Sequence, residues 1–225
     1  MAMRKGAWLV TFAVFALVLV TTFFWYQKWY WPAALVLLGV TFIPFYARFE
    51  GRRVRAEEIV LLAELAAIAA VVRIPFAAIP SVQPTSFIII MAGLALGSER
   101  GFLTGSMAAL VSNIFLGQGP WTPWQMFAWG MMGFTAGWLA KSRLASQRGV
   151  HLIFGLAWGF LFGWFMNLWY LCSMGQDLSW PLYLVACLAS FPMDCAHGIG
   201  NAFFLLLFER QFLKILQRIC IKYRL

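Results

Sequence analysis

The chain has 225 residues, of which 63% are hydrophobic and only 11% are charged, and its mean hydropathy is +0.80. Soluble domains carry about 25% charged residues, so this composition leaves no room for a separate soluble domain. It predicts an all-α polytopic membrane protein, because a helix satisfies its own backbone hydrogen-bonding groups inside lipid. The net charge of +9 would also suit a nucleic-acid-binding protein, and the positions of the charges decide that question below.

Eight apolar segments follow one another, at 8–26, 32–47, 59–74, 84–97, 101–116, 124–140, 150–172 and 181–208. A straight membrane crossing needs about 20 residues, so segment 84–97 is too short to cross unless protein surrounds it. The last segment contains Pro192, which predicts a kink or a break. The polar stretch 48–58 separates two leading segments from the other six, which divides the chain into 1–55 and 56–225.

The basic residues fix the expected orientation. With the N-terminus in the cytoplasm and eight crossings, fifteen of the 17 lysines and arginines fall on the inner side, and only Lys28 and Arg73 fall outside. Short loops rich in lysine and arginine stay in the cytoplasm, so we expect both termini there, in the cytoplasmic membrane of a prokaryote. Charges spread along one membrane face do not form a nucleic-acid groove, and we expect no nucleic-acid partner.

Catalytic and metal-binding patterns are missing from the sequence. The four cysteines form no CxxC pair, and only two histidines are present, so we expect no metal site. No Walker A motif occurs, and the chain therefore has no P-loop of its own for ATP hydrolysis. We expect no enzyme activity and no bound cofactor.

Small residues line one stretch of the third apolar segment. Ala63 and Ala67 are four residues apart, as are Ala66 and Ala70. Small residues at this spacing allow a second helix to approach closely, either within the bundle or on a partner subunit.

The segment ends expected to face outward carry amides and tryptophans. Their candidate ligand-binding residues are Gln83, Asn113, Gln118, Trp121, Trp124 and Gln125. Amides that donate and accept, beside rigid aromatic rings, suit a large planar ligand rich in amides. The alternative is a belt of interfacial aromatic residues, which is the simpler reading for Trp29 and Trp31.

The last apolar segment adds Asp194, His197 and Asn201, which fall on one helix face at spacings of three and four residues. Ionisable residues inside a membrane are candidates for function. A structural hydrogen-bond cluster and a proton relay are the alternatives, whereas catalysis lacks a convincing nucleophile.

Residues 56–225 resemble the substrate-binding S-component of energy-coupling factor vitamin transporters. The resemblance is carried by four stretches: LLAELAAIAAVVR (61–73), PFAAIPSVQPTSFIIIMAGLALG (75–97), GSMAALVSNIFLGQGPWTPWQMFAWGMMGFTAGWLA (105–140) and FPMDCAHGIGNAFFLLLF (191–208). The third stretch is most similar to S-components assigned to cobalamin and related compounds. The two leading transmembrane helices depart from the usual core of six.

The resemblance implies that the protein binds a vitamin near its outer face and topples within the bilayer to release it inward. A transmembrane coupling subunit and two ATPase subunits would drive this step, which fits the missing Walker A motif. Ala63, Ala66, Ala67 and Ala70 would contact the coupling subunit. Cobalamin is the expected transported substrate, with riboflavin, thiamin, folate or a queuosine-like base, or a stand-alone secondary transporter, as alternatives.

Overall fold

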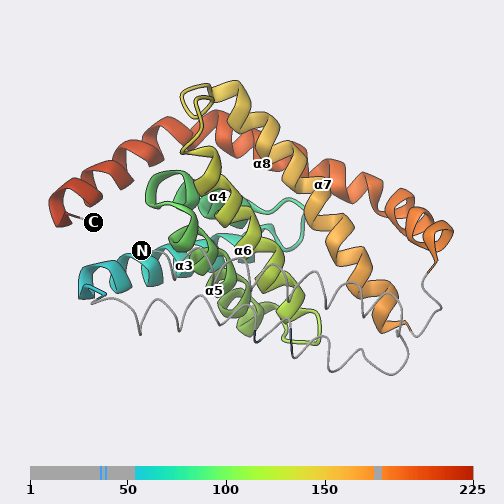
Figure 1. The fold of residues 1–225 in the computed structure, drawn as a ribbon. Helices are drawn as coiled ribbons and strands as arrows, with labels where there is room; N and C mark the ends of the chain where they lie inside the picture. Colours follow the sequence, from blue (N-terminus) through green and yellow to red (C-terminus); the bar gives the residue numbers. More distant parts are fainter. Residues whose placement is uncertain (1–35, 37–38, 40–53, 175–178, 225) are drawn as a thin grey trace.

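A computed structural model of the chain describes residues 36, 39, 54–174 and 179–224 (Figure 1). In residues 54–224 its elements are six helices and no strand: α3 (Ala56–Phe76), α4 (Pro84–Leu96), α5 (Ser98–Leu116), α6 (Thr122–Leu139), α7 (Arg148–Ser173) and α8 (Trp180–Tyr223). The expected helical core of six is therefore confirmed. The two leading helices predicted within residues 1–55 lie almost entirely outside the described residues.

Three of the described helices, α3, α7 and α8, are long and apolar enough to cross a membrane. The fourth apolar helix, α4, has only 13 residues, which is the short segment that the sequence predicts. Its start is set by Pro84 in the first turn, and its end by Gly97, whose φ of 92° interrupts the helix.

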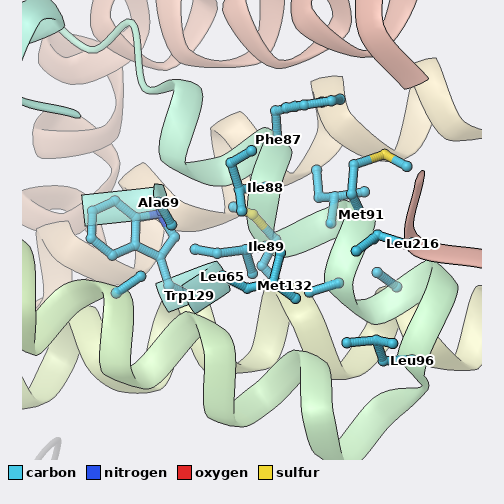
Figure 2. Packing of buried hydrophobic residues seen from close by; sticks show 14 of the residues in the cluster. Leu65, Ala69, Phe87, Ile88, Ile89, Met91, Leu96, Trp129, Met132 and Leu216 are labelled. Atoms are coloured by element: carbon cyan, nitrogen blue, oxygen red, sulfur yellow. The ribbon is translucent and has the colours of Figure 1, made fainter. Parts of the chain in front are cut away.

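Helix α4 forms the centre of the bundle and is packed against α3, α5, α6 and α8. Its isoleucines and Met91 are fully buried, and Trp129 of α6 and Leu216 of α8 complete the cluster. In Figure 2, Trp129 lies beside Ala69 at one end of this core, and Leu96 lies at the other. Protein on every side explains how so short an apolar helix is accommodated.

Glycines allow two helix pairs to touch backbone to backbone. Gly159 of α7 lies against Gly198 of α8, and Gly133 of α6 lies against Gly101 of α5. A methyl group on either Gly159 or Gly133 would collide with the facing backbone, which no side-chain rotation relieves. Small residues at such crossings are the usual means by which membrane helices pack closely.

Helix α8 runs for 44 residues without interruption, and its length of about 66 Å exceeds the hydrocarbon thickness of about 30 Å. Pro192 lies within it, so the predicted break does not occur. The sequence pattern also ended this segment at residue 208, whereas the helix continues to Tyr223. Figure 1 shows α8 arching over the other helices toward the start of α3.

Candidate functional site

Arg73, near the end of α3, is the centre of a polar cluster between α3, α4 and α5. Its Nε donates to Gln83 Oε1 (3.2 Å), and its Nη1 donates to Ser112 Oγ (2.7 Å) and Asn113 Oδ1 (2.8 Å). All three partners are neutral, and no acidic side chain in the described part of the chain pairs with this guanidinium. Among the described residues, the charge of this guanidinium therefore has only neutral hydrogen-bond partners.

Asn113 extends this cluster to the start of α6. Its side chain is 1% exposed, and its Nδ2 donates to Thr122 Oγ1 (3.0 Å) and Gln125 Oε1 (2.8 Å). Thr122 Oγ1 in turn donates to Gln118 Oε1 (2.9 Å), while Gln118 Nε2 donates to the carbonyl of Leu110. Four of the predicted residues, Gln83, Asn113, Gln118 and Gln125, thus belong to one hydrogen-bonded network.

Aromatic rings continue from this cluster across the bundle. The Arg73 guanidinium lies 4.9 Å from the centre of the Trp129 ring, and Trp129 is stacked on Phe162 of α7 with centroids 5.1 Å apart. Phe162 then meets His197 of α8 edge to face at 5.1 Å. We call Arg73, Trp129, Phe162 and His197 the aromatic row. It connects the polar cluster on α3 to the predicted polar face of α8.

Asp194, His197 and Asn201, which the sequence predicts on one face of the last helix, are all buried, so this face of α8 is directed into the bundle. Their partners differ. His197 Nε2 is hydrogen-bonded to Ser86 Oγ of α4 (2.8 Å), and Asn201 Nδ2 donates to the Gly155 carbonyl of α7 (3.0 Å).

Asp194 Oδ2 accepts from Ser190 Oγ (2.9 Å) of its own helix, and Ser190 Oγ also accepts from Asn167 Nδ2 of α7 (2.9 Å). His197 therefore belongs to the aromatic row, and Asn201, one turn further along α8, ties α8 to α7, whereas Asp194 belongs to a separate cluster between α7 and α8.

Two buried polar atoms at or beside the row have no hydrogen-bond partner among the described residues, Trp129 Nε1 and Asn201 Oδ1, and Trp124 Nε1 is a third such atom in a separate cluster with Phe127 and Phe165. A buried donor or acceptor without a partner costs about 1–3 kcal/mol. Natural proteins leave few such groups, and each calls for a specific explanation.

The two tryptophans predicted in the 117–125 loop differ in their surroundings. Trp121 is half-buried and meets Trp169 of α7 edge to face at 5.8 Å. Trp124 is completely buried and packs on Phe165 at 5.5 Å. Of the two, only Trp121 retains an exposed surface.

The alanines of α3 also divide into two pairs. Ala66 is 3% exposed and Ala70 is 0% exposed, both within the bundle, whereas Ala63 and Ala67 are exposed. The contact of all four with a coupling subunit stays a prediction, and in this chain only Ala63 and Ala67 present surface to a partner. A helix exposes one side only, and Ala63 and Ala67 are on it.

Buried ion pairs occur where the sequence places the cytoplasmic ends of the helices. Arg100 Nε donates to Glu58 Oε1 (2.9 Å), and His151 Nδ1 lies 2.6 Å from Glu209 Oε1. Arg148 Nε is 3.6 Å from Glu209 Oε2. These pairs tie α3 to α5 and α7 to α8, and none of their residues belongs to the polar cluster around Arg73.

Sequence reasoning missed Arg73, Ser86, Ser112, Thr122, Trp129 and Phe162 as members of the site. For Arg73 the sequence does contain a signal that could have identified it, because it is one of only two basic residues assigned to the outer side. The hydroxyl and aromatic residues are ordinary membrane-helix residues, and only their contacts distinguish them.

A helical membrane protein with a buried polar and aromatic layer at one end has the architecture of a ligand-binding transport component. A family model described as "ECF-type riboflavin transporter, S component" matches residues 54–207, about two thirds of the chain and most of the described helices. The chain therefore belongs to this family of S components.

Members of this family are substrate-binding components of transporters rather than enzymes, and they work with ATPases and a coupling subunit. No curated protein and no solved structure matches the chain.

Proposed function

We propose that this S component binds a flavin, riboflavin in the first instance, where the polar cluster around Arg73 meets the rings of Trp129 and Phe162. The observation that carries the proposal is the position of buried, unpartnered polar atoms beside stacked aromatic rings on the same helices. The family match, whose description names riboflavin, points to the same ligand class.

The chemistry of a flavin fits these groups. Its tricyclic ring is flat, and it would stack on Trp129 or Phe162 by separating these two rings, whose centroids lie 5.1 Å apart in this structure. Its pyrimidine edge carries two carbonyl oxygens and an imide N–H. The indole Nε1 of Trp129 and the guanidinium of Arg73 are donors for the carbonyls, and Asn201 Oδ1 is an acceptor for the imide.

Cobalamin, the substrate expected from the sequence resemblance, is the competing proposal. It also offers many amide groups to the glutamines of the outer loop. The riboflavin family match favours the alternative substrate, so we place the flavin first and retain cobalamin as the rival that the binding experiment must separate.

For transport, we propose that the exposed side of α3 at Ala63 and Ala67 meets the coupling subunit. These two alanines are one turn apart and exposed, which lets a partner helix approach α3 closely. Uptake then requires ATPases on other chains, and release follows a toppling motion in the bilayer. The orientation with both termini in the cytoplasm belongs to this proposal.

The decisive experiment titrates the purified protein into riboflavin and follows flavin fluorescence, which stacking against tryptophan quenches. We expect saturable quenching of riboflavin fluorescence that excess cobalamin does not reverse. Binding of cobalamin without quenching by riboflavin would transfer the site to a corrinoid. Binding of neither compound would refute both substrate assignments and leave only the membership of the family.

A matched pair of variants on one helix tests the location. Trp129→Phe keeps an aromatic ring and removes the Nε1 donor, and we expect about five- to tenfold weaker riboflavin binding. Trp138→Phe changes the same residue type at a site on α6 that is 55% exposed, and it should leave binding unaltered. Equal effects of the two variants would place the flavin elsewhere.

A further inference from the structure

The exposed side of α8 changes chemistry abruptly near Glu209. Up to this point it presents large apolar residues, including Leu206, Leu207 and Phe208, which are 50%, 50% and 44% exposed. Beyond it the exposed residues include Arg210, Lys214, Arg218 and Lys222, which recur every four residues. Residues four apart are neighbours on a helix surface, so these cations form one stripe.

The opposite side of the same helical segment is held on the protein. Leu216 is 2% exposed within the central core, and Phe212 meets Phe87 of α4 with centroids 5.4 Å apart. At the end of α8, Arg55 Nη1 donates to the carbonyl of Arg224. The segment is therefore held on the bundle, and its four basic residues are on the exposed side.

Two large apolar residues are exposed among the cations. Ile215 is 52% exposed and Ile221 is 78% exposed. None of the four cations pairs with an acidic side chain in the described part of the chain. Basic residues mixed with exposed apolar ones are typical of helices that lie in a membrane interface.

We propose that this basic face of α8, formed by Arg210, Lys214, Arg218 and Lys222 with Ile215 and Ile221, binds acidic phospholipid headgroups. The apolar part of the helix ends directly before it, which puts the stripe at the depth of the headgroups. Anionic lipids attract lysine and arginine at this depth, and the isoleucines enter the acyl boundary beside them.

An acidic protein surface would also complement the charges. It does not account for exposed isoleucines between the cations, and it does not account for the direct continuation from the lipid-facing side of α8. The lipid therefore explains both the charge and the apolar residues, and its binding is independent of which vitamin the outer site takes.

The test measures retention of individual lipids on the detergent-solubilised full chain by native mass spectrometry. Phosphatidylglycerol and phosphatidylcholine with identical acyl chains are titrated in parallel. Lys214→Gln with Arg218→Gln removes two stripe charges. The matched control, Lys141→Gln with Arg143→Gln, removes two exposed charges from the turn between α6 and α7.

We expect the unmodified protein to prefer phosphatidylglycerol, the stripe variant to lose this preference by roughly tenfold, and the control to keep it. High salt should weaken the preference in the unmodified protein. Thermal melting in detergent confirms that both variants are folded.

An equal loss in the control would mean that net charge, and not this face, retains the lipid. Unchanged phosphatidylglycerol retention in the stripe variant would overturn the proposal. If the stripe variant also fails to co-purify with the ATPase and coupling subunits while it retains phosphatidylglycerol, the face would be assigned to a protein partner.

Discussion

Replacing each tryptophan of the 117–125 loop by alanine should separate ligand binding from stability. Trp124→Ala removes a ring that is 0% exposed and packs on Phe165, and a Trp-to-Ala change at a buried site costs about 3–5 kcal/mol of unfolding free energy. Trp121→Ala removes a half-buried ring whose described ring contact is the edge-to-face one with Trp169, worth about 0.5–1.5 kcal/mol.

The effects on riboflavin affinity should run the other way. Trp121 has exposed surface for a ligand, so Trp121→Ala should weaken binding about ten- to hundredfold, which corresponds to about 1–3 kcal/mol. Trp124→Ala should leave the affinity of the folded fraction within a fewfold of the unmodified protein.

The assay combines two measurements on each purified variant. Thermal melting in detergent reports stability, and flavin fluorescence quenching, normalised to the folded fraction, reports affinity. Trp29→Ala and Trp31→Ala, at predicted belt positions outside the described residues, are the controls for affinity. The reasoning is refuted if Trp124→Ala loses affinity without losing stability, or if Trp121→Ala destabilises as much as Trp124→Ala.

Three further changes test the coupling face, the helix seam and the buried charges. Ala67→Trp should abolish uptake in cells and preserve riboflavin binding by the isolated chain, whereas Ala157→Trp, at an exposed alanine of α7, should affect neither. Gly159→Leu should force α7 from α8 and lower the melting temperature sharply; an unchanged melt would contradict the close approach. Glu58→Gln should cost about 3–5 kcal/mol by leaving the Arg100 charge unpaired, measured by SDS unfolding, and a change below about 1 kcal/mol would show that water already solvates the pair.

Local sequence signals predicted the elements well where one residue type controls the backbone. Pro84 and Gly97 bound the short helix as expected, and the spacing of Asp194, His197 and Asn201 puts them on one helix face, which the structure buries. In each case the property depends on residues of one segment, the ends of a helix or the spacing along it, and the sequence of that segment is therefore sufficient to predict it.

Local sequence signals were insufficient where contact with another helix determines whether a residue is buried. The four alanines follow one pattern, yet only the packing of α3 against its neighbours buries Ala66 and Ala70. Trp124 is buried because Phe165 of α7 covers it. Proline removes one helical hydrogen bond, yet α8 continues through Pro192.

The end of α8 illustrates a signal that was present and unused. Leu213, Leu216, Ile219 and Cys220 recur at helical spacing on the side opposite the basic stripe. By mean hydropathy the apolar segment ends at Phe208, because the mean hydropathy falls where the basic residues begin. Periodicity carries the helix further, since an amphipathic segment keeps its apolar stripe when its average becomes polar.

Helix α3 connects the two halves of the proposed function. Arg73 near its C-terminal end holds the polar cluster, and Ala63 and Ala67 occupy its exposed side. Ten residues of helix separate Ala63 from Arg73, about 15 Å, and no glycine or proline interrupts them. A ligand that takes hydrogen bonds from Arg73 must compete with Gln83, Ser112 and Asn113, which tie α3 to α4 and α5. Loading the site would therefore loosen α3 from its own bundle, and the same helix would offer its alanines to the coupling subunit.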